Sequence, residues 1–303
     1  MMYENFKKEL AEKLEEMFVK EHGGKVAFTT VNKVNRVVEQ VSLCFETEGT
    51  SMGPSFTLEP FFDDHENGVK KIDEIAKEMV DIALKPVPKV YEAFSKEFVL
   101  KHASFRLLNG EKNQHLVDGY FTEPFLDLLM VYSVDFEDVD EGHCSFLVTK
   151  GFAMANKITF EELREAAHKN MGEPAIHTLA EILGIPEDSF CEGGVVMRAV
   201  GINRPFGASY LVHISEWASS IQEAYGCEQF VVLPSSIEEL LVVPFDKENA
   251  ENQLLALLAT TGEVNEGLLE TDEESFLSDS IYLWDGEVVF KVDEHIARSI
   301  VAC

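Results

Sequence analysis

Residues 230–245, FVVLPSSIEELLVVPF, hold two short runs of apolar and β-branched side chains on either side of a polar break. Runs of this length and composition predict two buried strands, at 230–233 and 240–243. Ser235 and Ser236 place two hydroxyl groups at the end of the first strand, before acidic residues that are typical of the first turn of a helix. The break is therefore expected to be a capped turn leading into a short helix between two strands.

Helices and strands alternate around this stretch. Amphipathic helices are expected at 215–225 and 249–258, and a terminal hairpin at 281–291 turns over Asp285 and Gly286. Because strands are interleaved with helices and the chain closes on a hairpin, the pattern predicts an α+β fold. We expect mixed, largely antiparallel sheets with flanking amphipathic helices, arranged in two lobes.

The middle of the chain gives weaker patterns. Residues 97–108 fit either a helix or a strand, residues 125–136 predict a buried strand, and residues 175–183 predict a short helix. Thr159 and Glu162 stand at the spacing of a capping box, which predicts the start of a helix between them.

The N-terminal part of the chain has clear periodicity. Amphipathic helices are predicted at 6–18 and 72–83, and a hairpin is predicted from strands at 26–34 and 37–45. Pro86 and Pro88 stop the second helix and mark the expected boundary between the lobes. We expect an N-terminal α/β lobe at 1–88 and a C-terminal α+β lobe at 89–303.

The composition is that of a globular and strongly acidic protein. Hydrophobic residues make up 46% of the 303 residues, and 25 Lys and Arg against 55 Asp and Glu give a net charge of −30. Such a surface repels phosphate backbones and anionic lipid headgroups, so neither nucleic acid nor a membrane is expected as a partner. The N-terminus lacks the apolar run of a signal peptide, and no apolar run approaches the roughly 20 residues of a membrane span.

The five cysteines are an odd number and lie far apart in the chain. They match neither a disulfide framework nor a zinc-binding set, and this usage is typical of a reducing compartment. We therefore expect a soluble cytoplasmic protein.

Charge is concentrated toward the C-terminus. Residues 246–303 contain 14 acidic and 3 basic side chains, a local net charge of −11. Such a stretch is typical of a solvated face that keeps a protein soluble, and it is also where a basic protein partner would dock.

Motif searches of the sequence give negative results for cofactor chemistry. No phosphate-binding loop, dinucleotide-binding glycine motif or nucleophile elbow occurs. Residues 63–66 (DDHE) gather four potential ligands, but neighbouring side chains point different ways, so a polar turn explains them better than a metal. Glu165 and His168 have the spacing of a di-iron ligand pair, which requires a second pair that the sequence lacks. We expect no metal and no cofactor.

Two polar strings provide the candidate binding residues. The string NRPFGA, which supplies Asn203, Arg204 and Gly207, lies between apolar strands and would place an arginine and an amide at a cleft. The string LPSSI supplies the hydroxyl groups of Ser235 and Ser236. Each string is also explained by a structural loop that joins two strands.

The sequence resembles a bacterial family, domain of unknown function 5688, in strings that follow one another in the same order. These strings are FLDL at 125–128, NRPFGA at 203–208, LPSSI at 233–237 and LSDSIY at 277–282. The resemblance covers most of the chain, and it implies no activity, cofactor or catalytic residue. A weaker similarity in the order of elements extends to a second bacterial family, domain of unknown function 1444.

Three functions remain open on the sequence. The first is a non-catalytic cytoplasmic binding or adaptor protein, whose acidic C-terminal stretch would take a protein partner. The alternative is an enzyme, such as a hydrolase, with a cleft near Asn203, Arg204, Ser235 and Ser236. The third is a DNA mimic, which the charge favours and the high hydrophobic content opposes.

Overall fold

The computed structural model describes residues 2–47, 50–85, 95–138, 142–184, 197–234 and 236–299. The chain divides into two compact units, Met1–Glu92 and Ala93–Cys303, which are described separately here. The expected boundary residues Pro86 and Pro88 lie outside the described ranges. Within the described ranges, no helix is both long and apolar enough to cross a membrane.

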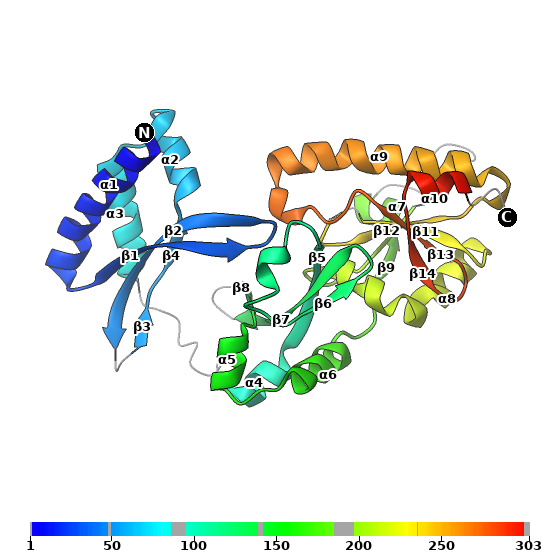
Figure 1. Cartoon of the computed structure of the whole chain (residues 1–303), viewed down its shortest axis with the longest axis horizontal. Helices are drawn as coiled ribbons and strands as arrows, with labels where there is room; N and C mark the ends of the chain where they lie inside the picture. The colour runs from blue at the N-terminus through cyan, green and yellow to red at the C-terminus, as the bar shows by residue number, and fades with distance from the viewer. Residues whose placement is uncertain are drawn as a thin grey trace. The chain divides into compact units, whose positions relative to one another are not determined.

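The N-terminal unit packs helices on one face of a small antiparallel sheet (Figure 1). Its elements are α1 (Met2–Leu14), the π-helical turn η1 (Glu15–Lys20), β1 (Lys25–Lys33), β2 (Arg36–Thr47), β3 (Thr50–Met52), β4 (Ser55–Thr57), α2 (Leu58–Glu66) and α3 (Ile72–Ala83). The apolar stripes of α1 and α3 meet Val41 and Leu43 of β2 in a common core. The predicted helices and the β1–β2 hairpin are confirmed, and the hairpin turns at Asn35, which has a left-handed φ of 60°.

The C-terminal unit contains two antiparallel sheets. In the first sheet, β7 pairs with β5 along one edge and with β6 and β8 along the other. Its strands are β5 (Ala103–Asn109), β6 (Thr122–Phe125), β7 (Leu128–Asp138) and β8 (Gly142–Leu147). The short helices on this side of the unit are α4 (Lys96–Lys101), η3 (Gln114–Leu116), α5 (Lys150–Ala155) and α6 (Phe160–Asn170).

The second sheet has six strands in the order β14-β13-β11-β12-β10-β9. These strands are β9 (Ile176–Thr178), β10 (Arg198–Val200), β11 (Phe230–Leu233), β12 (Leu240–Pro244), β13 (Ile281–Trp284) and β14 (Val289–Val292). The remaining helices are α7 (Leu179–Leu183), the 3-10 segment η5 (Gly207–His213), α8 (Ile214–Tyr225), η6 (Lys247–Asn249), α9 (Ala250–Thr271), η7 (Glu273–Ser275) and α10 (Glu294–Ser299).

Both faces of the six-stranded sheet are covered, which explains the uninterrupted apolar run of β11. Val231 and Leu233 pack toward α9 and α10, whereas Phe230 on the opposite face contacts Trp217 of α8. Figure 1 shows α9 and α8 on opposite sides of this sheet. The predicted α+β class with antiparallel sheets is confirmed, and every strand pairing in the described residues is antiparallel.

Several local predictions need correction. The acidic residues after Ser236 do not start a helix, because residues 236–239 form the non-helical connection from β11 to β12. Residues 175–183 begin as strand β9, which pairs with β10, before Thr178 caps α7. The ambiguous stretch at 97–108 is a helix followed by a strand, and the helix predicted at 249–258 runs on to Thr271.

Candidate functional site

The NRPFGA and LPSSI strings meet where η5 begins. The backbone N–H of Gly207 donates to the carbonyl of Glu238 at 2.9 Å, and Ala208 N–H donates to Ile237 O at 3.2 Å. Gly201, with a φ of +96°, lies against Gly207 so closely that neither position has room for a Cβ atom. These contacts fix the loop at residues 201–207 against the connection that follows β11.

The start of η5 also attaches the two sheets of the unit to each other. Ser209 is buried, and its Oγ accepts a hydrogen bond of 3.2 Å from Leu107 N–H on the edge of β5. The aromatic ring of Phe206, which adopts a left-handed φ of 60°, lies 3.7 Å from the Arg106 guanidinium. The first sheet therefore ends against the loop that carries Asn203 and Arg204.

A buried ion pair lies under this loop. Arg106 Nη2 on β5 donates to Asp135 Oδ1 on β7 at 3.0 Å, and their side chains are only 8% and 10% exposed. Ser133 Oγ donates to Asp135 Oδ2 at 3.2 Å. Burial lowers the pKa of Arg106, while Asp135 acts against this effect, so the guanidinium stays charged and holds the carboxylate in one orientation.

Arg204 extends this polar array toward solvent. Its Nη2 donates to Ser104 Oγ and its Nη1 donates to the carbonyl of Met171 at 3.2 Å. The distance from Arg204 Nη2 to Asp135 Oδ2 is 3.9 Å, which is too long for a hydrogen bond. The Arg204 side chain is 19% exposed, compared with 8% for Arg106.

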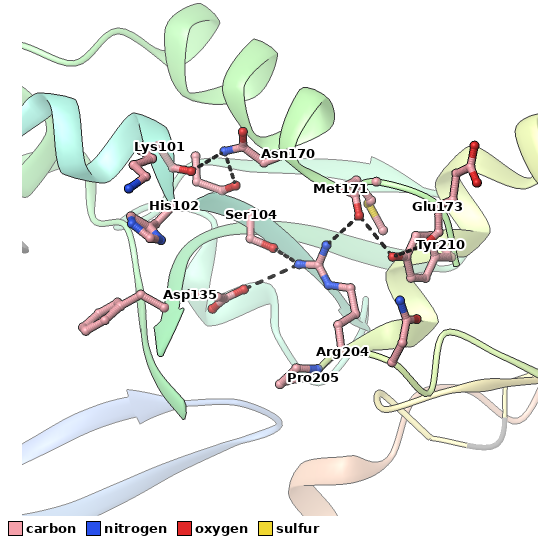
Figure 2. Close-up of a pocket in the computed structure, with 14 residues that line it drawn as sticks. Lys101, His102, Ser104, Asp135, Asn170, Met171, Glu173, Arg204, Pro205 and Tyr210 are labelled. Atoms are coloured by element: carbon pink, nitrogen blue, oxygen red, sulfur yellow. Dashed lines mark hydrogen bonds and ion pairs between the residues drawn. The ribbon is translucent and has the colours of Figure 1, made fainter. Parts of the chain in front are cut away.

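These groups line a pocket of about 640 Å³, which we call the Arg204 pocket (Figure 2). Its lining residues come from α4, β5, β7, the end of α6 and the residues after it, the loop before η5, and η5 itself. They are Lys101, His102, Ala103, Ser104, Asp135, Phe136, Asn170, Met171, Gly172, Glu173, Asn203, Arg204, Pro205 and Tyr210. The volume is typical of small-molecule sites.

The walls of the Arg204 pocket are held by hydrogen bonds to the backbone. The two N–H groups of Asn170 Nδ2 are shared among three carbonyls at the end of α4 and the start of β5, each at 3.0 Å. The single O–H of Tyr210 lies between two acceptors, Met171 O at 3.0 Å and Glu173 O at 3.2 Å. Because these side chains are already committed, the pocket keeps its shape before any ligand arrives.

The structure brings some of the predicted site residues together and separates others. Asn203 and Arg204 both line the pocket, and Asn203 Oδ1 accepts from Ala175 N–H at 3.0 Å. Gly207 is buried beside the loop. Ser236 is not among the residues that line the pocket; its Oγ accepts from Glu238 N–H at 2.9 Å, as in a local turn. Ser235 lies outside the described residues.

Sequence reasoning missed Ser104, Arg106 and Asp135. Arg106 interrupts the apolar strand string SFRLL, and Asp135 interrupts VYSVDF. A charged residue within a buried strand needs a partner of opposite charge, so the two interruptions together are the signal that a buried ion pair exists.

The FLDL and LSDSIY strings also meet, at a second buried polar cluster. Asp127 accepts hydrogen bonds from Ser278 Oγ at 2.7 Å and from Tyr282 OH at 3.0 Å. Burial and the Asp127 charge raise the pKa of Tyr282 well above its ordinary value, so its phenol stays protonated and donates. This cluster attaches the β6–β7 turn to β13 and has a structural role.

Two histidines on α6 and η5 form a chain of ring contacts on the other side of β5. His168 Nδ1 lies 2.9 Å from His213 Nε2, and His213 Nδ1 lies 2.7 Å from the Glu216 carboxylate. His168 Nε2 is buried and has no hydrogen-bond partner among the described residues. His168 thus pairs with His213, which lies 45 residues along the chain.

We expect the C-terminal unit to lose stability as the pH falls below about 6.5. Burial, with His213 and Arg164 nearby, lowers the pKa of His168, and burial with Lys101 nearby lowers the pKa of His102. As the pH falls below the ordinary histidine pKa, these rings take up protons in the unfolded chain but stay neutral in the folded protein. The stabilisation is therefore complete above the ordinary histidine pKa and is lost as the pH falls toward the lowered values.

Urea unfolding followed by tryptophan fluorescence measures this effect, because the only two tryptophans, Trp217 and Trp284, are buried in the C-terminal unit. His168→Gln should reduce the slope of unfolding free energy against pH by up to about 1.4 kcal/mol per pH unit for each proton no longer taken up. The exposed His295 provides the control substitution, His295→Gln. An unchanged slope in His168→Gln would contradict the assignment.

The comparisons with known proteins identify a family and no activity. The sequence pattern of DUF5688, a family of unknown function, matches residues 3–286. No curated protein and no solved structure matches the chain. In the described ranges, no group of three or more His, Cys, Asp or Glu side chains is placed to hold a metal ion. Because the family match spans both units, the chain belongs to the DUF5688 family.

Proposed function

We propose that this protein is a non-catalytic binding protein that holds a small polar ligand in the Arg204 pocket. The observation that carries the proposal is the guanidinium of the partly exposed Arg204, held by Ser104 and Met171 in the lining of a pocket of about 640 Å³. A polar side chain that is already fixed in a pocket of this size favours ligand binding, because little side-chain entropy is lost when the ligand binds.

The contacts favour binding over the alternative of hydrolysis. Ser104 Oγ receives a hydrogen bond from the Arg204 guanidinium, which fixes the hydroxyl as an anchor. Asp135, the nearby carboxylate, is engaged by Arg106 and Ser133. A serine nucleophile instead needs a base within hydrogen-bond reach, and among the described residues no histidine or carboxylate hydrogen-bonds Ser104.

A screen with a small-molecule cell extract tests the proposal. After incubation and removal of excess extract, native mass spectrometry should show a reproducible extra mass on the wild-type protein. Arg204→Gln should weaken its retention by about 10-fold or more, because a hydrogen-bonded charge contributes roughly 1.5–3 kcal/mol. Arg298→Gln, at an exposed position on α10, should retain the mass.

The proposal fails if no mass is retained and no compound in the extract raises the melting temperature of the wild-type protein. It also fails if Arg204→Gln keeps the retained mass while its far-ultraviolet circular dichroism matches that of the wild type.

We also propose a protein partner for the acidic C-terminal stretch. Glu263, Glu266 and Glu270 are all exposed, and their spacing of three and four places them on one face of α9. Leu269, three residues after Glu266, neighbours it on the helix surface and is partly exposed, so a basic partner would contact charged and apolar surface together.

Replacing these three glutamates with glutamine should abolish capture of that partner and leave the fold intact. Affinity capture with wild-type and variant protein, followed by mass spectrometry, makes the comparison. A triple substitution at the equally exposed Glu12, Glu15 and Glu16 of the N-terminal unit is the matched control. Equal capture by all three proteins would remove the acidic face from the proposal.

The proposed compartment is the cytoplasm. Among the described residues, Cys44 and Cys227 form no disulfide, and reduced thiols are typical of proteins in reducing compartments.

A further inference from the structure

We propose that the ligand of the Arg204 pocket is a small molecule with a single carboxylate group attached to an apolar or aromatic body. The carboxylate would bind the Arg204 guanidinium, and the body would lie along the apolar walls of the pocket. This inference rests on the proposed binding function and specifies its ligand class.

The first step is the count of charges around Asp135. Two guanidinium groups, Arg106 and Arg204, face this one carboxylate. Arg106 Nη2 hydrogen-bonds Asp135 Oδ1 at 3.0 Å, whereas Arg204 Nη2 lies 3.9 Å from Asp135 Oδ2. Asp135 and the nearby Glu238 both act on Arg106. Among the described residues Arg204 hydrogen-bonds only neutral oxygens and has no carboxylate within hydrogen-bond distance, so an anion placed against it would supply one.

The second step is the count of hydrogen-bond donors. A guanidinium carries five N–H groups, and Arg204 directs hydrogen bonds to two neutral oxygens, Ser104 Oγ and Met171 O. Because Nη1 and Nη2 each donate one of these hydrogen bonds, three N–H groups remain without a hydrogen-bond partner among the described residues, and the side chain is 19% exposed and lines the pocket. Charged N–H donors of this kind match the oxygens of a carboxylate.

The third step excludes a cationic ligand. Asp135 is 10% exposed, and its two oxygens already accept hydrogen bonds from Arg106 and Ser133. Figure 2 shows the other carboxylate of the lining, Glu173, pointing away from the Arg204–Asp135 pair. A ligand ammonium group would thus meet a carboxylate that is already hydrogen-bonded and the positive charge of Arg204.

The fourth step separates a carboxylate from a phosphate. A doubly charged phosphate needs several converging cations, and the second cation of the lining, Lys101, points away from Arg204 in Figure 2. The net charge of −30 further disfavours a dianion. One guanidinium beside the apolar surfaces of Phe136, Pro205 and Met171 fits one charge on an apolar body.

Phenylacetate and its neutral isostere phenylacetamide test this inference, with benzylamine and inorganic phosphate as the cationic and dianionic probes. Binding is followed by isotope-edited NMR of the full-length protein. We expect saturable shifts for phenylacetate at backbone amides around Ser104, Met171 and Arg204. Phenylacetamide should bind at least about 10-fold more weakly, because it cannot supply the charge.

Two substitutions test whether Arg204 is the residue that binds the carboxylate. Arg204→Gln should reduce phenylacetate binding to the level of phenylacetamide, and Arg298→Gln should leave both affinities unchanged. Equal binding of acid and amide would overturn the carboxylate assignment. Tighter binding of benzylamine or phosphate, or no saturable phenylacetate binding up to about 10 mM, would also overturn it.

The extract screen distinguishes the two possible failures. If an extract compound is retained through Arg204 and proves to be uncharged, cationic or a phosphate, the carboxylate inference fails and the binding function stands. If the extract yields no ligand either, both fail.

Discussion

Gly207→Ala is expected to lower the free energy of unfolding of the C-terminal unit by about 3 kcal/mol or more. A Cβ atom at Gly207 would lie 2.2 Å from Gly201 O and 2.5 Å from Glu238 O. Both contacts are with backbone, so neither can be relieved by rotating a side chain. The loop at 201–207 and the connection after β11 would have to separate, and the hydrogen bond from Gly207 N–H to Glu238 O would be lost.

Gly262→Ala is the matched control for this substitution. Gly262 lies within α9, and a Cβ atom there meets nothing within 4 Å. Because alanine is the better helix former, this variant should be more stable than the wild type by about 0.5–1 kcal/mol. Urea unfolding followed by the fluorescence of Trp217 and Trp284 compares the two variants. A Gly207→Ala protein as stable as the wild type would show that the two segments are not held in close contact.

The same contact explains why Gly207 looked like a binding residue in the sequence. A Pro/Gly loop between strands predicts either a cleft or a tight turn, and the sequence alone does not separate the two. The structure assigns the parts of NRPFGA to different roles: Arg204 lines the pocket, whereas Gly207 allows two backbone segments to touch. The distinction depends on the contacts of Gly207 with Gly201 in the same loop and with Glu238, which is distant in the sequence.

Elements defined by local patterns could be predicted from the sequence. The hairpin over Asp285 and Gly286 follows from its turn residues, and Gly286 has the expected positive φ of 112°. The start of α6 follows from Thr159 and Glu162, whose reciprocal hydrogen bonds form the predicted capping box. Each of these signals lies within a few residues of the element that it sets.

Elements that depend on distant pairing could not be predicted. The sequence pattern at 175–183 favoured a helix throughout. Strand β9 has only three residues, and it is a strand because Ile176 and Thr178 pair with β10. The acidic residues after Ser236 were typical of a helix start, yet the carbonyl of Glu238 accepts from Gly207 N–H. In both cases a contact far along the chain outweighs the local preference.

The candidate site was predicted only in part for the same reason. Asn203 and Arg204 lie in a loop, and polar residues in loops are frequent binding residues. Ser104 and Asp135 lie on two strands of the first sheet, and they reach the pocket because β5 pairs along its whole length with Leu128–Val134 of β7, directly before Asp135. The pairing register decides which side chains share a face, and no motif in the sequence states that register.

Arg106→Met is expected to destabilise the C-terminal unit by about 3–5 kcal/mol, because it removes one partner of a buried ion pair. Asp135 would keep the hydrogen bond from Ser133 and would have Arg204 only at 3.9 Å, so its charge would remain buried and poorly compensated. Phe206 would also lose the guanidinium that lies 3.7 Å from its ring. Urea unfolding with tryptophan detection measures the loss.

The double variant Arg106→Met/Asp135→Leu separates the ion pair from packing. It removes both charges and keeps apolar volume between β5 and β7, so it should recover most of the stability lost in Arg106→Met. If the double variant is as unstable as Arg106→Met, the loss comes from packing of the long side chain.

Arg106→Met should also weaken ligand binding at Arg204, because an Asp135 carboxylate that has lost Arg106 becomes available to the Arg204 guanidinium. The buried pair would then serve the pocket by keeping Asp135 occupied, which leaves Arg204 free for the ligand.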